Sequence, residues 1–412
     1  MRLLLASLAA ALLAAMPAPA QAAATGPCLP DGSGPKCHFW KLKVTDVNDG
    51  DTVGGDVLGD GRVRREVVRF SGIQTMELKQ YNPKHRTGEC HAVRPTLQVE
   101  RLIRRSGGVV RISSQNPNAL QDVRLRRWVA VRQGGRWVDL GELLIREGKA
   151  LWLGGITEWA WNERYARAEQ LAKREGRYVW NQDACGAGPS AGLPIGLWVQ
   201  WNPVGGDRDN GGEWVKIRNL SPDRPLPLGG WTLRDASHLY FHFKRGTVVA
   251  PGDTITVHVK SGVASASNFY WGVNRLVFEN FEDDGRYNGG GAYLYDPHGD
   301  IRASMQYPCL VACTNPLPGA LSVTPVPNGD NERVIVRSTS GTPVDLYGYA
   351  LDVPGGMLAF DEGTVVQPGA ARVVRMPDAR RLPDRGGIVR VTTFDMVQAA
   401  CVDWGNGRCP AP

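Results

Sequence analysis

The residues from Asp49 to Glu77 combine the side chains that phosphodiester chemistry requires. Asp49-Gly50-Asp51-Thr52-Val53 is an acidic turn, and the predicted strand that follows carries Arg69. The segment ends on Gly72-Ile73-Gln74-Thr75-Met76-Glu77. Carboxylate and amide oxygens are the ligands of a hard divalent cation, and a guanidinium group binds phosphate. This stretch therefore predicts a site for a metal ion and a phosphodiester together.

Each of these residues also has an interpretation without chemistry. Asp-Gly-Asp is a common turn sequence, and Glu77 fits an exposed carboxylate near a loop. Arg69 fits the solvated face of a strand, and Arg126 fits a cluster of surface arginines with Arg124 and Arg127. Their occurrence together, in one order, favours a site over these alternatives.

The order of the motifs resembles that of the staphylococcal nuclease (thermonuclease) family. D-G-D-T-V is followed by a strand with an arginine, then by G-I-x-T-x-E, and then by Asp122 with Arg126 four residues later. The resemblance covers Trp40 to Cys185 and implies a small OB-type β-barrel with packed helices. It also implies a calcium-dependent endonuclease, with Ca²⁺ as cofactor and DNA, and also RNA, as substrates.

The resemblance implies a role for each site residue. Asp51 matches a metal-ligating carboxylate, and Thr75 matches a threonine whose backbone carbonyl binds calcium. Arg69 and Arg126 match the arginines that hold the phosphate, and Glu77 matches the glutamate that orients or deprotonates the attacking water. Gln74 stands where the family has a second metal-ligating aspartate, in G-I-D-T-P-E, and Met76 replaces the proline. An amide oxygen brings no charge, so we expect Gln74 to bind calcium more weakly.

The elements that position these residues follow from hydrophobic periodicity. Alternation and β-branched runs predict strands at 40–47, 52–53, 67–70, 109–112 and 124–131. A helix is predicted from Pro95 to Arg105, and a short one follows the capping box Asp139-x-x-Glu142 and ends at Gly148. The last helix is predicted to open at 162–165 and to close at 178–181. Its apolar stripe comprises Trp161, Tyr165, Ala168 and Ala172.

The second half of the chain has the pattern of β-sandwiches. Residues 186–194 are rich in Gly, Pro, Ala and Ser and predict a linker. The motifs at 213–219, 228–235 and 270–272 resemble the lamin tail domain, an immunoglobulin-like sandwich, over 193–308. The pattern recurs in weaker form at 319–404, where 332–337 echoes 213–218 and 363–369 echoes 246–252. The predicted fold is multidomain: an OB-fold barrel with helices at 38–185, then one clear and one degenerate sandwich.

The termini and cysteines indicate an exported protein. Residues 1–24 have the charge, the apolar run and the small residues of a secretory signal peptide, so we expect a secreted protein without a transmembrane segment in its mature form. The eight cysteines favour disulfides, with Cys28–Cys37 and Cys90–Cys185 as the expected pairs in the first half. Cys309 and Cys313 leave zinc binding as an alternative.

Charge is concentrated in the first half. Residues 25–190 hold 27 Lys and Arg against 19 Asp and Glu, whereas 191–412 hold 20 against 22. Polyanion binding is therefore expected from residues 25–190, with the sandwiches as binding or anchoring modules for an unidentified envelope, protein or nucleic-acid partner. The leading hypothesis is a secreted calcium-dependent nuclease. The alternative is a non-catalytic nucleic-acid-binding or cell-surface interaction protein with a degenerate nuclease domain.

Overall fold

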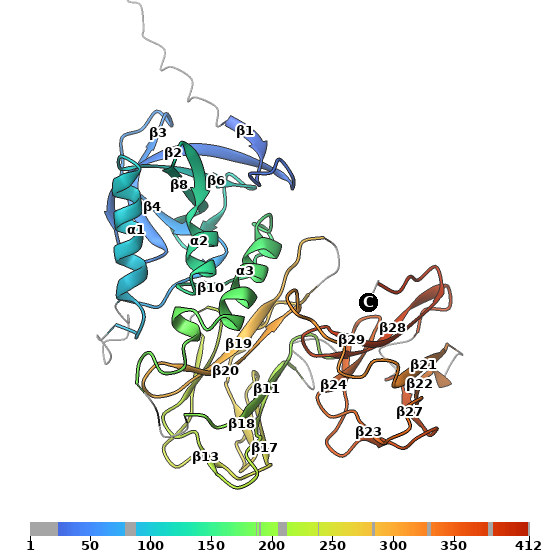
Figure 1. Cartoon of the computed structure of the whole chain (residues 1–412). Coiled ribbons are helices and arrows are strands. Elements are labelled where there is room, and N and C mark those ends of the chain that lie inside the picture. Colours follow the sequence, from blue (N-terminus) through green and yellow to red (C-terminus); the bar gives the residue numbers. More distant parts are fainter. Residues whose placement is uncertain are drawn as a thin grey trace, which may run out of the picture.

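A computed structural model describes residues 24–410 except 79–87, 187, 189–190, 205–211, 238, 282–284, 328–330 and 378–381. The signal peptide predicted at 1–24 falls, apart from its last residue, outside this part. Figure 1 shows an N-terminal lobe with barrel and helices (blue to green), a β-lobe below it (yellow-green to light orange) and a second β-lobe to its side (dark orange to red). A buried apolar cluster is centred in each lobe, and that of the middle lobe also includes Ala350, Met357 and Phe394 of the third. We call the lobes the first domain, the first sandwich and the second sandwich.

The first domain is built on a closed β-barrel. Its strands run in the order β2-β3-β4-β8-β6, and β6 pairs again with β2 to close the ring. Only the pairing of β4 with β8 is parallel among these neighbours. The N-terminal β1 extends the sheet beside β2, and Cys28 and Cys37 belong to the same core. The strands are β1 (Ala24–Pro27), β2 (Lys36–Val47), β3 (Thr52–Leu58), β4 (Glu66–Phe70), β5 (Ile73–Gln74), β6 (Val109–Ser114), β7 (Leu120–Gln121), β8 (Arg124–Gln133), β9 (Arg136–Asp139) and β10 (Leu151–Trp152).

Helices α1 (Val93–Arg105), α2 (Leu140–Arg146) and α3 (Asn162–Arg174) pack on this barrel. The Asp139 carboxylate caps α2 by accepting a hydrogen bond from the Glu142 backbone N–H at 2.8 Å, as the capping box predicts. The predicted apolar stripe of α3 is buried. However, α3 ends at Arg174 and not at 178–181. Gly176 adopts φ 63°, which breaks the helix, and Tyr178–Trp180 forms a separate 3₁₀ turn, η1.

The first sandwich consists of two facing sheets, in which only the pairing of β17 with β18 is parallel among the described strands. One sheet has the order β11-β12-β17-β18, and the other has the order β15-β14-β19-β20. Alternation buries Val215 and Ile217 of β12, while Lys216 and Arg218 stay partly exposed. Its strands are β11 (Ile195–Gln200), β12 (Trp214–Asn219), β13 (Leu226–Pro227), β14 (Thr232–Asp235), β15 (Tyr240–His242), β16 (Val248–Val249), β17 (Thr254–His258), β18 (Asn268–Tyr270), β19 (Gly290–Tyr295) and β20 (Ile301–Tyr307).

The second sandwich repeats this arrangement. Its sheets have the orders β21-β22-β27 and β25-β24-β28-β29, and within the described residues nothing corresponds to β18. The echoed glutamates even share a function: Glu213 and Glu332 are buried and accept hydrogen bonds from the backbone N–H groups of Phe278 and Leu382 respectively. The strands are β21 (Leu321–Val326), β22 (Arg333–Ser338), β23 (Val344–Asp345), β24 (Tyr349–Val353), β25 (Gly356–Ala359), β26 (Val365–Val366), β27 (Ala371–Arg375), β28 (Gly386–Thr393) and β29 (Gln398–Gly405).

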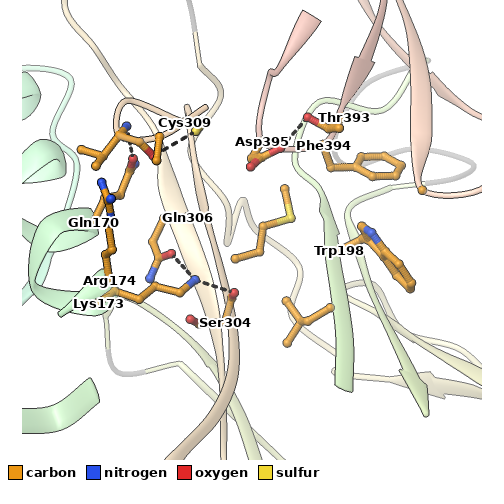
Figure 2. A pocket seen from close by; sticks show the side chains of 15 residues that line it. Gln170, Lys173, Arg174, Trp198, Ser304, Gln306, Cys309, Thr393, Phe394 and Asp395 are labelled. Atoms are coloured by element: carbon orange, nitrogen blue, oxygen red, sulfur yellow. Dashed lines mark hydrogen bonds between the residues drawn. The ribbon is translucent and has the colours of Figure 1, made fainter. Parts of the chain in front are cut away.

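The first sandwich packs directly against the first domain and against the second sandwich. A buried cluster joins Met76 and Trp180 of the first domain to Tyr293 and Tyr295 of the first sandwich. All three lobes also line a cavity of about 490 Å³ (Figure 2). At its edge, Lys173 of α3 donates hydrogen bonds to the Ser304 carbonyl at 2.9 Å and to Gln306 Oε1 at 2.8 Å.

All eight cysteines are paired. The predicted pairs Cys28–Cys37 and Cys90–Cys185 are confirmed, and Cys401 pairs with Cys409. Cys309 pairs with Cys313, so the zinc alternative there is wrong because neither sulfur remains a free thiolate. These disulfides fit an extracellular protein. No helix among the described residues is long and apolar enough to cross a membrane.

We predict that the Cys90–Cys185 disulfide stabilises the first domain more than a short-range one could. Its partners are 95 residues apart, against 4 for Cys309–Cys313. Loop-closure entropy then predicts that Cys90→Ser/Cys185→Ser lowers the free energy of unfolding by about 2–3 kcal/mol more than Cys309→Ser/Cys313→Ser. Urea denaturation of both double variants checks this. Equal losses would contradict it.

Candidate functional site

The barrel brings the predicted site residues together. Asp51 lies just before β3, and Thr52 pairs directly with Arg69 of β4. Arg69 in turn pairs with Arg126 of β8 across the parallel ladder. The chain then turns after β4 into β5, which places Gln74 and Thr75 beside Asp51. The segment 49–77 and the distant strand β8 thus supply one cluster.

The Arg69 guanidinium lies between the two side chains predicted to bind the metal. Its Nη1 is 2.9 Å from Asp51 Oδ1, and its Nη2 donates to Gln74 Oε1 at 2.6 Å. The three side chains are almost fully buried, with Arg69 only 3 % exposed. The interpretation of Arg69 as a solvated strand residue is therefore wrong. Its positive charge is held by these two oxygens inside the domain.

The remaining polar atoms of Asp51 and Gln74 bind Thr75 and Glu77. Asp51 Oδ2 accepts hydrogen bonds from the Thr75 backbone N–H at 2.7 Å and from its hydroxyl at 3.0 Å. Gln74 Nε2 donates to the Thr75 carbonyl at 2.9 Å and to Glu77 Oε1 at 3.1 Å. Arginine can only donate, so the amide oxygen of Gln74 must face Arg69. The orientation of Gln74 is thus fixed by its partners.

Asp49 belongs to the site, although the sequence analysis assigned it no role. Burial raises the pKa of the Asp49 carboxyl to about 7, and the nearby charges of Asp51 and Glu77 add to this shift. Gly50 is required between the two aspartates because a Cβ there would lie 2.8 Å from Thr75 Cγ2. In the sequence, the D-G-D motif was the feature that could have identified Asp49 as a site residue. The crowding of three carboxylates favours a bound cation, which would relieve their repulsion.

Arg126 is half-buried beside Arg69. Burial lowers the pKa of Arg126, the charge of Arg69 lowers it further, and Glu158 and Glu279 oppose the shift. Glu158 is itself held by the backbone N–H groups of Gln115 and Asn116. In the part of the chain that the structure describes, the Arg126 guanidinium makes no hydrogen bond. It is therefore available to an anion, and its interpretation as one of several surface arginines is not supported by its burial.

The first sandwich supports the site from one side, which the sequence did not reveal. Glu89 accepts a hydrogen bond from the Glu77 backbone N–H at 2.8 Å and another from the Tyr240 hydroxyl at 3.0 Å. Arg234, only 1 % exposed, lies 3.5 Å from the same carboxylate and 3.9 Å from Met76 Sδ. Met76, which replaces the proline of the nuclease motif, is thus an interdomain contact.

The side chains present suit a hard cation such as calcium. Asp51, Gln74 and Thr75 offer carboxylate, amide and carbonyl oxygens, the ligand types that calcium prefers. The Asp51 and Gln74 oxygens already converge on one positive group, because the Arg69 guanidinium holds both. A cation there would have to displace Arg69. A different grouping, Cys90, His91 and Cys185, is no metal site because its two sulfurs form a disulfide.

The comparisons with known proteins support one of the two resemblances. The model of the Lamin Tail Domain family matches residues 199–309, within the region predicted as 193–308 but for its last residue. No nuclease family model matches the first domain, whose likeness to staphylococcal nuclease therefore remains a hypothesis. A search of curated proteins found no match. The first sandwich is thus similar to lamin tail domains, and the first domain is an OB-like barrel.

We predict that Gln74→Asp increases calcium affinity. The added charge faces the cation position, so the dissociation constant should fall about tenfold, the scale on which ligand charge tunes such sites. Isothermal titration calorimetry measures this directly. Gln74→Leu, which removes the oxygen, is the matched control and should bind calcium more weakly than the parent. An unchanged constant in both variants would show that Gln74 does not contact the metal.

We predict that Asp49 destabilises the folded protein at alkaline pH. Its folded pKa of about 7 lies above the usual 3.8, so the folded state keeps this proton to higher pH than the unfolded state, and stability falls as pH rises from 4 to 7. With a chelator present, Asp49→Asn should be more stable than the parent by about 2 kcal/mol at pH 8, after allowance for solvent screening, and by little at pH 4. Urea denaturation at both pH values checks this. The exposed Asp122→Asn should show no such pH-dependent difference.

Proposed function

We propose that the first domain is a calcium-dependent endonuclease that hydrolyses phosphodiester bonds of DNA and also RNA. The observation that carries the proposal is the Arg69 guanidinium, which holds the convergent oxygens of Asp51 and Gln74 next to a second arginine and a carboxylate. Metal-binding oxygens, phosphate-binding cations and a base are the groups that such hydrolysis needs.

Each side chain then has a task that its contacts suit. Asp51, Gln74 and Thr75 would hold calcium, which when bound neutralises the phosphate and presents a water. With the oxygens of Asp51 and Gln74 holding the cation, Arg69 would be free to bind the phosphate together with Arg126. The planar guanidinium groups offer paired donors to the phosphate oxygens and stabilise the negative charge that develops there. Glu77, held by Gln74 at 3.1 Å, would accept the proton of the attacking water.

The net positive charge of residues 25–190 supports a polyanionic substrate. The sandwiches carry slightly more acidic than basic residues, so we assign them no main part in holding nucleic acid. We propose that they bind or anchor an unidentified partner, and that the protein is exported by its N-terminal signal peptide.

A second candidate function is nucleic-acid binding without cleavage. It is favoured by the completeness of the network: Asp51, Arg69 and Gln74 satisfy one another with no cation present. Retention of Glu77 favours the enzyme, because a carboxylate beside a bound polyanion only weakens binding.

We predict that the purified full chain nicks plasmid DNA with calcium and not with a chelator. Arg126→Ala should lower turnover about a hundredfold, because its contact strengthens as charge builds on phosphorus. Glu77→Gln should abolish cleavage while DNA binding persists or tightens slightly. Initial rates of nicking and filter binding measure the two effects separately.

Arg124→Ala is the matched control for these variants. Arg124 lies two residues before Arg126 on β8 and pairs with the exposed Asp122, so its loss should change turnover by no more than about twofold. DNA binding without nicking at any calcium concentration would favour the second candidate. Undiminished cleavage by Glu77→Gln would remove Glu77 from the mechanism.

A further inference from the structure

The barrel carries a basic face that is separate from the Asp51–Arg126 cluster. On β2, alternation turns Leu42 inward, where it is fully buried, and turns its neighbours on either side outward. Lys41 pairs with Arg111 of β6, which pairs with Ala130 of β8, so these residues share one face. Arg132 of β8 pairs with Trp137 of β9 on the same side. Figure 1 shows β2, β6 and β8 side by side. We call the set the basic sheet face: Phe39, Lys41, Lys43, Arg111, Arg132 and Trp137.

Arg111 is held at the centre of this face by two aromatic rings. Its guanidinium carbon lies 5.0 Å from the centroid of Phe39 and 5.3 Å from that of Trp137. Stacking fixes the guanidinium plane without using its N–H donors. No hydrogen bond or ion pair of its side chain occurs within the described residues. Burial lowers the pKa of Arg111, and Asp139 opposes the shift, so the charge is partly desolvated and lacks a close counterion.

The surrounding cations are also unpaired. Lys41, Lys43 and Arg132 are exposed, and their side chains make no hydrogen bond or ion pair in the part of the chain described here. By comparison, two other basic side chains of the barrel have acidic partners: Arg65 pairs with Asp46 and Arg124 with Asp122. Lys41 stands directly opposite Arg111, an arrangement of like charges that costs stability. Among the described strand partners, Asp56 stands opposite Lys43 and Asp139 stands opposite Ala130. The Asp139 carboxylate is buried and accepts hydrogen bonds from the Tyr165 hydroxyl and the Glu142 backbone N–H.

We propose that the basic sheet face binds single-stranded nucleic acid, with phosphates on Arg111, Lys41 and Arg132 and bases stacked on the exposed parts of Trp137 and Phe39. Unpaired cations interleaved with aromatic rings are the elements of sequence-tolerant single-strand binding, and stacking requires bases that are not paired in a duplex. The inference rests on the proposed function of the first domain, because it gives that domain a second contact with the same polymer.

Fluorescence anisotropy with labelled 20-mers of thymidine and uridine tests this on the full chain. Arg111→Gln should weaken binding about tenfold and reduce the slope of log affinity against log salt by about one. Trp137→Ala should weaken binding about tenfold with little change in slope, and Trp137→Phe should restore part of the loss. Comparing the two oligomers shows whether DNA, RNA or both are bound. Arg174→Ala removes an exposed cation of α3 away from this face and is the matched control.

The outcomes separate this inference from the proposed function. If both variants bind the oligomers as the parent does while Arg126→Ala loses binding, the basic sheet face is not a binding site and the nuclease proposal stands. If Arg111→Gln weakens binding no more than Arg174→Ala, the attraction is general electrostatics and the inference fails. If the parent binds neither oligomer, the inference fails, and plasmid nicking still tests the nuclease. Circular dichroism of Trp137→Phe and Arg111→Gln confirms that the variants fold.

Discussion

The buried contact of Arg69 with Asp51 and Gln74 is the constraint on which the site depends. A guanidinium that is 3 % exposed must have its charge compensated, and the two oxygens at 2.9 and 2.6 Å do this. The same oxygens tie the start of β3 to β4 and β5. The contacts that build the site therefore also fix how these strands lie relative to one another. Loss of either charged partner would leave the other unpaired inside the domain, which costs about 3–5 kcal/mol in such cases. The network is therefore part of the fold itself, and a cation that entered would have to replace the positive charge that Arg69 supplies.

The first sandwich extends this constraint to the residues after Gln74. Met76 packs against Tyr295, and Glu89 connects the Glu77 backbone to Tyr240 and Arg234. The segment that carries Thr75 and Glu77 is thus fixed by the barrel on one side and by the sandwich on the other. In that arrangement the sandwich is part of the support of the site. A carboxylate that must meet a water in a defined direction gains from such support, because small displacements of a catalytic group are costly.

The sequence predicted the elements with regular patterns and missed the contacts that the tertiary fold creates. Alternation located β2, and the 3.6-residue stripe located the buried side of α3, because each pattern is local. The echo of Glu213 in Glu332 revealed the repeat of the sandwich. By contrast, the end of α3 depends on the backbone conformation of Gly176. Nothing in the sequence around Arg234 indicates that this strand residue is buried. The stacking of Arg111 between Phe39 and Trp137 joins three strands, so no window of sequence contains it. Asp49 lay in a recognised motif, yet its pKa is raised first by burial, which the fold creates, and then by the charges of Asp51 and of the more distant Glu77.

The presence of glutamine at position 74 follows from the charge balance of the site. Asp49, Asp51 and Glu77 already outnumber the guanidinium groups of Arg69 and Arg126, and burial together with the charges of Asp51 and Glu77 raises the pKa of Asp49. A further aspartate at 74 would bind calcium more strongly but would make the fold depend on it. Gln74 offers an oxygen to Arg69 and, unlike a carboxylate, a donor to the Thr75 carbonyl and to Glu77. It therefore satisfies the cluster when no metal is bound, at the expense of metal affinity. Such a site suits an exported protein, because extracellular calcium sites function with dissociation constants of about 10⁻⁴–10⁻³ M. For the calcium-dependent function proposed above, weak binding would then be sufficient, and the domain would fold before calcium binds.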